Sequence, residues 1–495
     1  MTVLRGALVL LAVLLVAAVA GASGAVFWAA PLALGAGLLL ALATWYRPVV
    51  GAVVVVALVP ALSGLARGLV VPTLKVSELL LMLCLGAMVL RRPDRWRRAS
   101  WTDAALLLFA VVAFGFAALH SATGTSTLES LVRVGLQPAF FVMAYWVASR
   151  GVQRPADLRV VLRWMLLVSL VPAALALVQS AGVPGVDDML AWLTDGGLTA
   201  SDRSTGPFPI WHSLGGYLLV PTLLASVLLL RGDRSVLSRH WLLVVLLVDL
   251  AALVSTITVT FLVWLPVGLL VAAAAGGRLL RGAVLLAVLT AAALIVFPTA
   301  LQGRLDQQTT QTRYTAGGVL PQTVEYRILV WERDYLPLLD RGAASGLGND
   351  LPPDVLFPST ENQYITLVLR GGVVLPVTMM VALGALTLRA WRHARAPDVY
   401  RVSEPSPAAS RSAALTVLGV LVFLPAAMMV WPYLTNAGLS QTLAAFAGAS
   451  LALEPRRRSV AATAAARQRA REATAAADEA RALGAGSSTT AYAAR

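Results

Sequence analysis

Residues 241–276 read W-L-L-V-V-L-L-V-D-L-A-A-L-V-S-T-I-T-V-T-F-L-V-W-L-P-V-G-L-L-V-A-A-A-A-G, and Asp249 is the one charged residue in this run. The run holds two apolar segments, each near the ~17–25 residues that a helix needs to cross a bilayer. Similar runs recur along the whole chain, which is 58% hydrophobic and only 13% charged. Because a helix satisfies its own backbone groups in hydrocarbon, the sequence predicts an all-α, polytopic membrane protein.

Hydropathy predicts a membrane domain over residues 1–453 and an Ala/Arg-rich tail over 454–495 that is partly disordered. Two outer loops are long, 182–207 and 302–362, and the start of the second, from Gln302, is expected to be irregular. The prediction is about 14 transmembrane helices, at residues 6–22, 26–44, 48–65, 76–90, 102–120, 130–149, 160–181, 209–230, 241–257, 259–276, 282–301, 363–388, 412–432 and 437–453.

The net charge of +14 would favour a nucleic-acid partner in a soluble protein. Here most arginines lie in alternate segments between the spans, as the positive-inside rule describes, so membrane orientation explains the charge. The alternation predicts that both chain ends are cytoplasmic and that no nucleic acid is bound. The single cysteine, Cys84, excludes an intrachain disulfide, and no metal-ligand or cofactor motif is present.

Polar residues concentrate between Glu325 and Gly372, in the second outer loop and the span after it. Apolar spacing predicts a helix over 323–339, and Gly342, Gly346 and Gly348 are expected to end it. The two later glycines, in G-L-G, would also allow a ligand to approach the backbone closely. Any chemistry of this protein is expected in this stretch.

Two arginines and a tryptophan share the predicted loop helix. Arg327 and Trp331 are four residues apart and therefore lie on one face, and Arg333 follows on the same helix. Arginine forks suit phosphate oxygens, and Glu361 at the membrane mouth, beside Asn362, could accept a proton from a hydroxyl. The plainer interpretation is a loop helix that packs its tryptophan on the membrane surface.

Three ionisable residues fall inside predicted spans, where a charge is costly and therefore a candidate for function. Arg133 lies four residues into its span and could instead extend to the outer surface. Asp249 could be a paired structural aspartate. Arg370 precedes Gly371-Gly372, which would let the helix bend or another backbone approach.

Taken together, these pieces resemble the O-antigen ligase and O-antigen polymerase superfamily of membrane glycosyltransferases. The resemblance is carried by R-I-L-V-W at 327–331, G-L-G at 346–348, E-N-Q-Y at 361–364 and G-G at 371–372. An earlier R-S-T-G-P-F, from Arg203, resembles a further feature of the family. The likeness covers residues 203–388. Where ligases have His, this chain has Glu361, which is more similar to polymerase-like members.

The resemblance implies an inverting, metal-independent transfer in a bacterial plasma (inner) membrane, as part of cell-surface polysaccharide biosynthesis. The donor would be a polyprenyl-diphosphate-linked glycan on the outer face, and the acceptor a hydroxyl of a glycan or lipid. Other polysaccharide-assembly proteins would be partners. Arg327 would bind the diphosphate, helped by Arg203 or Arg133, and Glu361 would orient or deprotonate the acceptor. Asn362 and Tyr364 would shape the pocket.

A lipid-linked oligosaccharide flippase is the alternative function with a similar number of spans. A flippase needs charges along a central path through many spans, whereas this chain has few charges inside spans. A lipid-phosphate-sugar glycosyltransferase is disfavoured, because the first predicted outer loop is short and has no acidic residue.

Overall fold

The computed structural model describes residues 29–68, 74–91, 99–194, 203–309, 321–350, 355–357, 359–395 and 407–453, with a few residues of the tail. These residues confirm the predicted all-helical fold, since their only strand-like pairing is an isolated bridge between Leu65 and Thr194. The first predicted span, 6–22, lies outside this part, as does most of the tail. The chain divides into two compact units, Met1–Leu453 and Glu454–Arg495.

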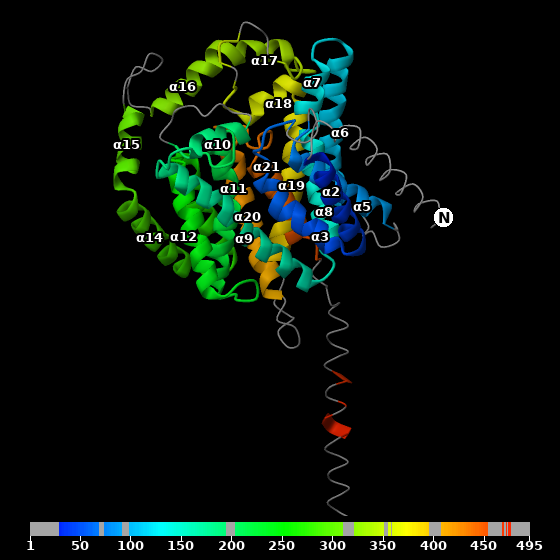
Figure 1. The fold of residues 1–495 in the computed structure, drawn as a ribbon, viewed down its shortest axis with the longest axis vertical. Helices are drawn as coiled ribbons and strands as arrows, with labels where there is room; N and C mark the ends of the chain where they lie inside the picture. Colours follow the sequence, from blue (N-terminus) through cyan, green and yellow to red (C-terminus); the bar gives the residue numbers. More distant parts are fainter. Residues whose placement is uncertain are drawn as a thin grey trace, which may run out of the picture. The chain divides into compact units, whose positions relative to one another are not determined.

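The first unit contains the helices of Figure 1, several of which include one π-helical turn, labelled η. In chain order they are α2 (Ala29–Tyr46), α3 (Pro48–Val53), η1 (Val54–Leu58), α4 (Val59–Ala61), α5 (Val76–Leu90), α6 (Trp101–Ala122), α7 (Leu128–Ser130), η3 (Leu131–Gly135), α8 (Gln137–Gly151), α9 (Pro155–Ser180), α10 (Val186–Leu193), α11 (Trp211–Arg231), α12 (Arg239–Ser255), α13 (Val259–Ala275), α14 (Leu279–Val296), α15 (Pro298–Thr309), α16 (Gln322–Val330), η4 (Trp331–Tyr335), α17 (Leu336–Gly342), α18 (Gln363–Gly371), α19 (Val374–Arg395), α20 (Pro407–Ala427) and α21 (Leu439–Ser450).

Seven of the described helical segments are long and apolar enough to cross a membrane, and several shorter apolar helices accompany them. This supports a multi-pass membrane protein. A helix also lies at each predicted span from the second onward. The count of about 14 spans and the orientation of the chain in the membrane remain predictions.

Of three local expectations for the second outer loop and the span after it, two are wrong and one is confirmed. The predicted span at 363–388 is two helices, because the chain turns at Gly372, whose φ is +61° and where a Cβ would collide with the carbonyl of Ala344. Residues 302–309, expected to be irregular, belong instead to α15, since exposed polar residues do not prevent helix formation once Pro298 has set the first turn; the rest of that expected irregular segment lies outside the described residues. The helix predicted over 323–339 is present as α16, η4 and α17.

Helix α11 forms the centre of the core. Nearly all of its residues are buried, and it packs against α9, α12, α13, α20 and α21. Figure 1 shows α12 and α14 on one side of α11, α2, α5 and α6 on the other, and α16, α17 and α18 near one end. Small residues allow close packing elsewhere in the bundle, as where Gly448 of α21 lies against the backbone of Tyr145 in α8.

That helix contact gives a stability prediction. Gly448→Ala places a methyl group against the Tyr145 carbonyl, so we expect the free energy of unfolding to fall by about 1–3 kcal/mol. Gly384→Ala in α19 meets nothing within 4 Å and should be neutral or stabilise the protein by up to about 1 kcal/mol, as Gly→Ala does in a helix. Thermal unfolding of both variants in detergent makes the comparison. Equal midpoints would show that the backbones of α8 and α21 are not in close contact.

Candidate functional site

Arg327 and Glu361 form an ion pair between two segments that are 34 residues apart in the chain. The Nη2 atom of Arg327 lies 3.3 Å from Oε2 of Glu361, and each side chain is only 14% exposed. Arg327 belongs to α16, whereas Glu361 lies just before α18. The structure therefore brings together the two residues that the sequence predicts to be catalytic.

Two further hydrogen bonds fix the Arg327 guanidinium. Its Nη1 donates to the carbonyl of Thr323 at 3.0 Å, one turn earlier in α16. Its Nε donates to the carbonyl of Val430 at 3.1 Å, in the segment between α20 and α21. All three guanidinium nitrogens are thus engaged, so Arg327 holds a single orientation in which it joins three parts of the fold.

The backbone of Glu361 adopts an uncommon conformation, with φ of +51°. Non-glycine residues seldom occupy this region, and when they do the surrounding contacts must hold them there. Here Trp331 supplies one such contact, because its indole Nε1 donates to the carbonyl of Thr360 at 2.8 Å. The Thr360 hydroxyl in turn donates to the carbonyl of Asn362 at 2.9 Å. The Glu361 carboxylate is therefore presented from a rigid turn.

Asn362 caps α18 and ties it to the segment after α20. Its Oδ1 accepts hydrogen bonds from the backbone N–H groups of Tyr364 and Ile365, at 2.8 and 3.1 Å. Its Nδ2 donates to the carbonyl of Met429 at 3.1 Å, and the N–H of Gln363 donates to that of Met428 at 2.8 Å. With Val430, three successive carbonyls thus accept from the site.

The sequence did not predict this part played by residues 428–430. They fall at the end of the expected span 412–432, but α20 ends at Ala427 and the chain then turns. The signal that would have located the turn is the W-P-Y run that begins at Trp431, because proline disfavours helix in the residue before it. The backbone carbonyls of the turn that follows α20 are the acceptors that the site uses.

The environment of Glu361 changes its acidity. Burial raises the pKa of this carboxyl above its ordinary value, and the charge of Arg327 and a hydrogen bond from the Ser359 side chain lower it in part. A carboxylate whose pKa is shifted towards neutrality is a better general base than an ordinary surface carboxylate. The pair thus combines a fixed cation with a proton acceptor at contact distance.

Aromatic side chains from the start of α11 lie beside the segment whose carbonyl accepts from Arg327. The ring of His212 stacks on Trp431, the residue after Val430, with centroids 4.2 Å apart, and Tyr433 meets His212 edge-on. The guanidinium of Arg203 lies over the ring of Trp211, 4.8 Å from its centroid, and burial lowers the pKa of Arg203. Arg203 therefore reaches the same end of the bundle, and His212 is a neighbour of the site that the sequence analysis did not single out.

Other predicted site residues have different surroundings. Arg333 pairs with its neighbour Asp334 at 3.4 Å and lies over the ring of Phe357. Arg133, more than half exposed, pairs with Glu129 one turn earlier at 3.7 Å. The Tyr364 hydroxyl donates to the carbonyl of Pro425 at 2.9 Å, which secures α18 against α20.

Gly346 and Gly348 contact the protein's own backbone. A Cβ at Gly346 would collide with Arg370 and Gly371, and one at Gly348 would meet the hydroxyl of Ser126. Both have positive φ, and the N–H groups of Leu347 and Gly348 donate to the carbonyl of Leu369 in α18. Packing thus accounts for these glycines. Arg370, half-buried in the last turn of α18, makes no ion pair with any residue that the structure describes.

Among the described residues, no group of three or more His, Cys, Asp or Glu side chains is placed to hold a metal ion. No protein-family model and no curated protein matches the chain. We therefore infer function from the residues of the site and from the resemblance of their motifs.

The cap at Asn362 gives a second prediction. Asn362→Ala loses two cap hydrogen bonds and the bond to Met429, and should lower the free energy of unfolding by about 1–2 kcal/mol. Asn362→Ser keeps a capping oxygen and loses only the bond to Met429, so its unfolding free energy should lie between those of the wild type and Asn362→Ala. Chemical denaturation in detergent measures the order. If serine destabilises as much as alanine, the cap is not the stabilising interaction.

Proposed function

We propose that this protein transfers a polyprenyl-diphosphate-linked glycan to an acceptor hydroxyl at the outer face of a bacterial plasma membrane, polymerising or ligating a surface polysaccharide. The observation that carries the proposal is the contact between Arg327 and Glu361. It sets a fixed cation beside a carboxylate of raised pKa at the end of a membrane helix bundle. This arrangement suits a reaction that releases a diphosphate while a hydroxyl loses a proton.

In the proposed reaction, the acceptor oxygen attacks the anomeric carbon of the donor from the side opposite the diphosphate. The new C–O bond forms as the bond from the anomeric carbon to the diphosphate oxygen breaks, so the configuration inverts. The acceptor proton passes to the carboxylate of Glu361, and the electron pair of the broken bond leaves on the diphosphate. Fixed arginine charges stabilise that leaving group as its charge develops.

Arg327 is the first candidate for the diphosphate site, and Arg203 is the second. Arg203 lies over Trp211 at the start of α11, and the adjoining His212 stacks on Trp431, next to the carbonyl that accepts from Arg327. A planar guanidinium can bind two phosphate oxygens at once, which favours arginine for this role. Arg133 and Arg333 are weaker candidates, because their side chains are 57% and 47% exposed against 14% for Arg327.

Asp249, buried in α12, does not favour the flippase alternative over the transferase. Asp249 is fully buried and accepts a hydrogen bond from the hydroxyl of Ser169 in α9 at 2.7 Å. A contact of this kind between neighbouring helices is a sufficient reason for the aspartate. The lipid-linked glycan that builds up in a deletion strain separates the two functions, since loss of a flippase leaves it on the inner face and loss of a transferase on the outer face.

The central substitution is Glu361→Gln, which keeps the size of the side chain and removes its capacity as a base. We expect the rate of glycan transfer to fall by about 10²–10⁴-fold, the usual contribution of a general base. Glu332→Gln removes an exposed carboxylate on η4 and is the matched control. Polymer formation by each purified variant, at equal amounts of inserted protein, is the measurement. Full activity of Glu361→Gln would remove Glu361 as the base.

A pH profile tests the same role without removing the carboxylate. The hydrogen bond from Ser359 lowers the pKa of Glu361, so Ser359→Ala should raise that pKa further. Because the base must be ionised, the acidic limb of the profile of kcat/KM should move to higher pH. Ser359→Thr keeps a hydroxyl and should leave the limb in place. An unmoved limb in Ser359→Ala would indicate that another group controls the acidic limb.

A further inference from the structure

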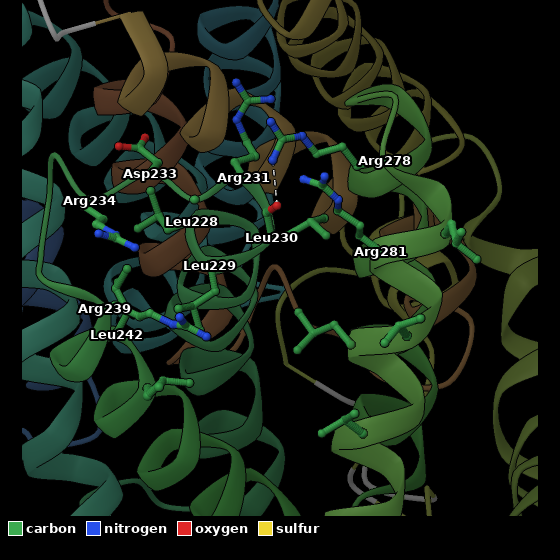
Figure 2. Close-up of a pocket in the computed structure, with 16 residues that line it drawn as sticks. Leu228, Leu229, Leu230, Arg231, Asp233, Arg234, Arg239, Leu242, Arg278 and Arg281 are labelled. Atoms are coloured by element: carbon green, nitrogen blue, oxygen red, sulfur yellow. Dashed lines mark hydrogen bonds between the residues drawn. The ribbon is translucent and has the colours of Figure 1, made fainter.

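A second feature of the molecule lies at the far end of α11 from Trp211. Helix α11 runs from Trp211 to Arg231, which places its two ends ~30 Å apart at ~1.5 Å per residue. At the Arg231 end, a pocket of about 730 Å³ opens between the ends of α11 and α12 on one side and α14 on the other. Figure 2 shows its arginine side chains around Leu228, Leu229 and Leu230.

Five arginines line this pocket, and Asp233 is the only acidic residue among its lining side chains. Arg278 donates to the carbonyl of Leu230 at 2.8 Å, and Arg231 donates to the hydroxyl of Ser412 at 3.1 Å. The carboxylate of Asp233 accepts hydrogen bonds from Ser235 and Ser412. Three arginines are exposed and make no ion pair or hydrogen bond within the part of the chain that the structure describes: Arg234, Arg239 and Arg281.

The rest of the pocket is apolar. On α14, Arg281 is followed by Val284, Leu285 and Val288, which share its helix face at spacings of three, four and seven residues. On α12, Arg239 is followed in the same way by Leu242 and Leu243. Each helix thus has an arginine in its first turn and apolar side chains in the turns that follow. The pocket is therefore positively charged at one end and apolar at the other.

Helix α14 leaves much of this apolar surface uncovered by protein. Gly282 and Leu289 are its only buried residues among those described, whereas Val284 and Val288 are more than half exposed. An inorganic anion would satisfy the arginines but would make no use of the apolar walls. An occupant with an anionic head and hydrocarbon chains satisfies both, because arginine pairs with phosphate and the chains bury the Leu and Val side chains.

We propose that this pocket binds an anionic glycerophospholipid. Its phosphate lies among Arg234, Arg239 and Arg281, and its acyl chains lie between α12 and α14. The site is separate from the Arg327–Glu361 pair, and the proposal does not depend on the proposed glycan transfer. The lipid extends the contact between α14 and the bundle, where Gly282 and Leu289 are buried and Leu285 and Leu286 are partly buried against the core.

The test is the affinity of the full-length protein for a fluorescent phosphatidylglycerol in nanodiscs of phosphatidylcholine. The triple variant Arg234→Gln/Arg239→Gln/Arg281→Gln should bind at least about tenfold more weakly, since each basic residue near an anionic lipid contributes about 1 kcal/mol. The control Arg154→Gln/Arg159→Gln/Arg392→Gln removes the same charge outside the pocket and should bind as the wild type does. Equal weakening in both variants would overturn the proposal, because charge alone would then explain binding.

A second variant tests the apolar half of the pocket. Val288→Trp places a large side chain in the space assigned to the acyl chains and leaves every arginine in place, so it should also weaken binding of phosphatidylglycerol. Inorganic phosphate at millimolar concentration should not displace the lipid. Displacement by phosphate, or unchanged affinity in Val288→Trp, would identify a simple anion site. Capture of an acidic protein by the wild type, with equal lipid affinity in the triple variant, would also contradict the lipid.

Discussion

The contact between Arg327 and Glu361 is the interaction on which the polar end of this protein depends. Charges out of water are costly, and a partly buried pair persists only where further hydrogen bonds compensate the lost hydration. Arg327 meets that requirement with two backbone carbonyls, of Thr323 and Val430. Glu361 meets it with Arg327 and Ser359. The pair therefore joins three segments that are far apart in sequence.

The end of α20 is what makes this arrangement possible. The carbonyls of the turn that follows a helix lie outside the helical hydrogen-bond pattern, and where they are buried the fold must supply donors for them. Here the donors come from the site itself, since Gln363, Asn362 and Arg327 donate to Met428, Met429 and Val430 in turn. The same turn carries Trp431, on which His212 of α11 stacks. The turn that ends α20 is thus the same turn that holds the site together.

Hydropathy was sufficient to place the apolar helices from the second predicted span onward, because a buried or lipid-facing helix requires a long apolar run, but it did not indicate the polar helix α15. It did not show the break at Gly372, since apolar residues continue beyond that glycine; the glycine pair had indicated a bend or a close backbone approach, and the backbone that approaches is that of Ala344. The motif residues Arg327 and Glu361 were predictable as a pair of candidates. Their contact was not, because it depends on carbonyls of an apolar segment that has no polar side chain to mark it.

The glycines of G-L-G illustrate the limit of reasoning from residue type. Gly346 and Gly348 allow close backbone approach, as the sequence indicated, but the backbone that approaches is that of α18. Likewise, His212, which stacks on Trp431 beside the site, lies far from the predicted loop in sequence. Which side chains surround a polar pair is decided by long-range packing, and a local pattern does not encode it.

The central claim is that the Arg327–Glu361 pair serves a transfer that breaks the bond between a glycan and a lipid diphosphate. The most direct measurement is to reconstitute the purified protein in liposomes with a polyprenyl-diphosphate-linked glycan and an acceptor glycan, in the presence of a metal chelator. The account predicts release of the free polyprenyl diphosphate and a product with inverted anomeric configuration. A donor that crosses the bilayer intact, with no diphosphate released, would contradict it.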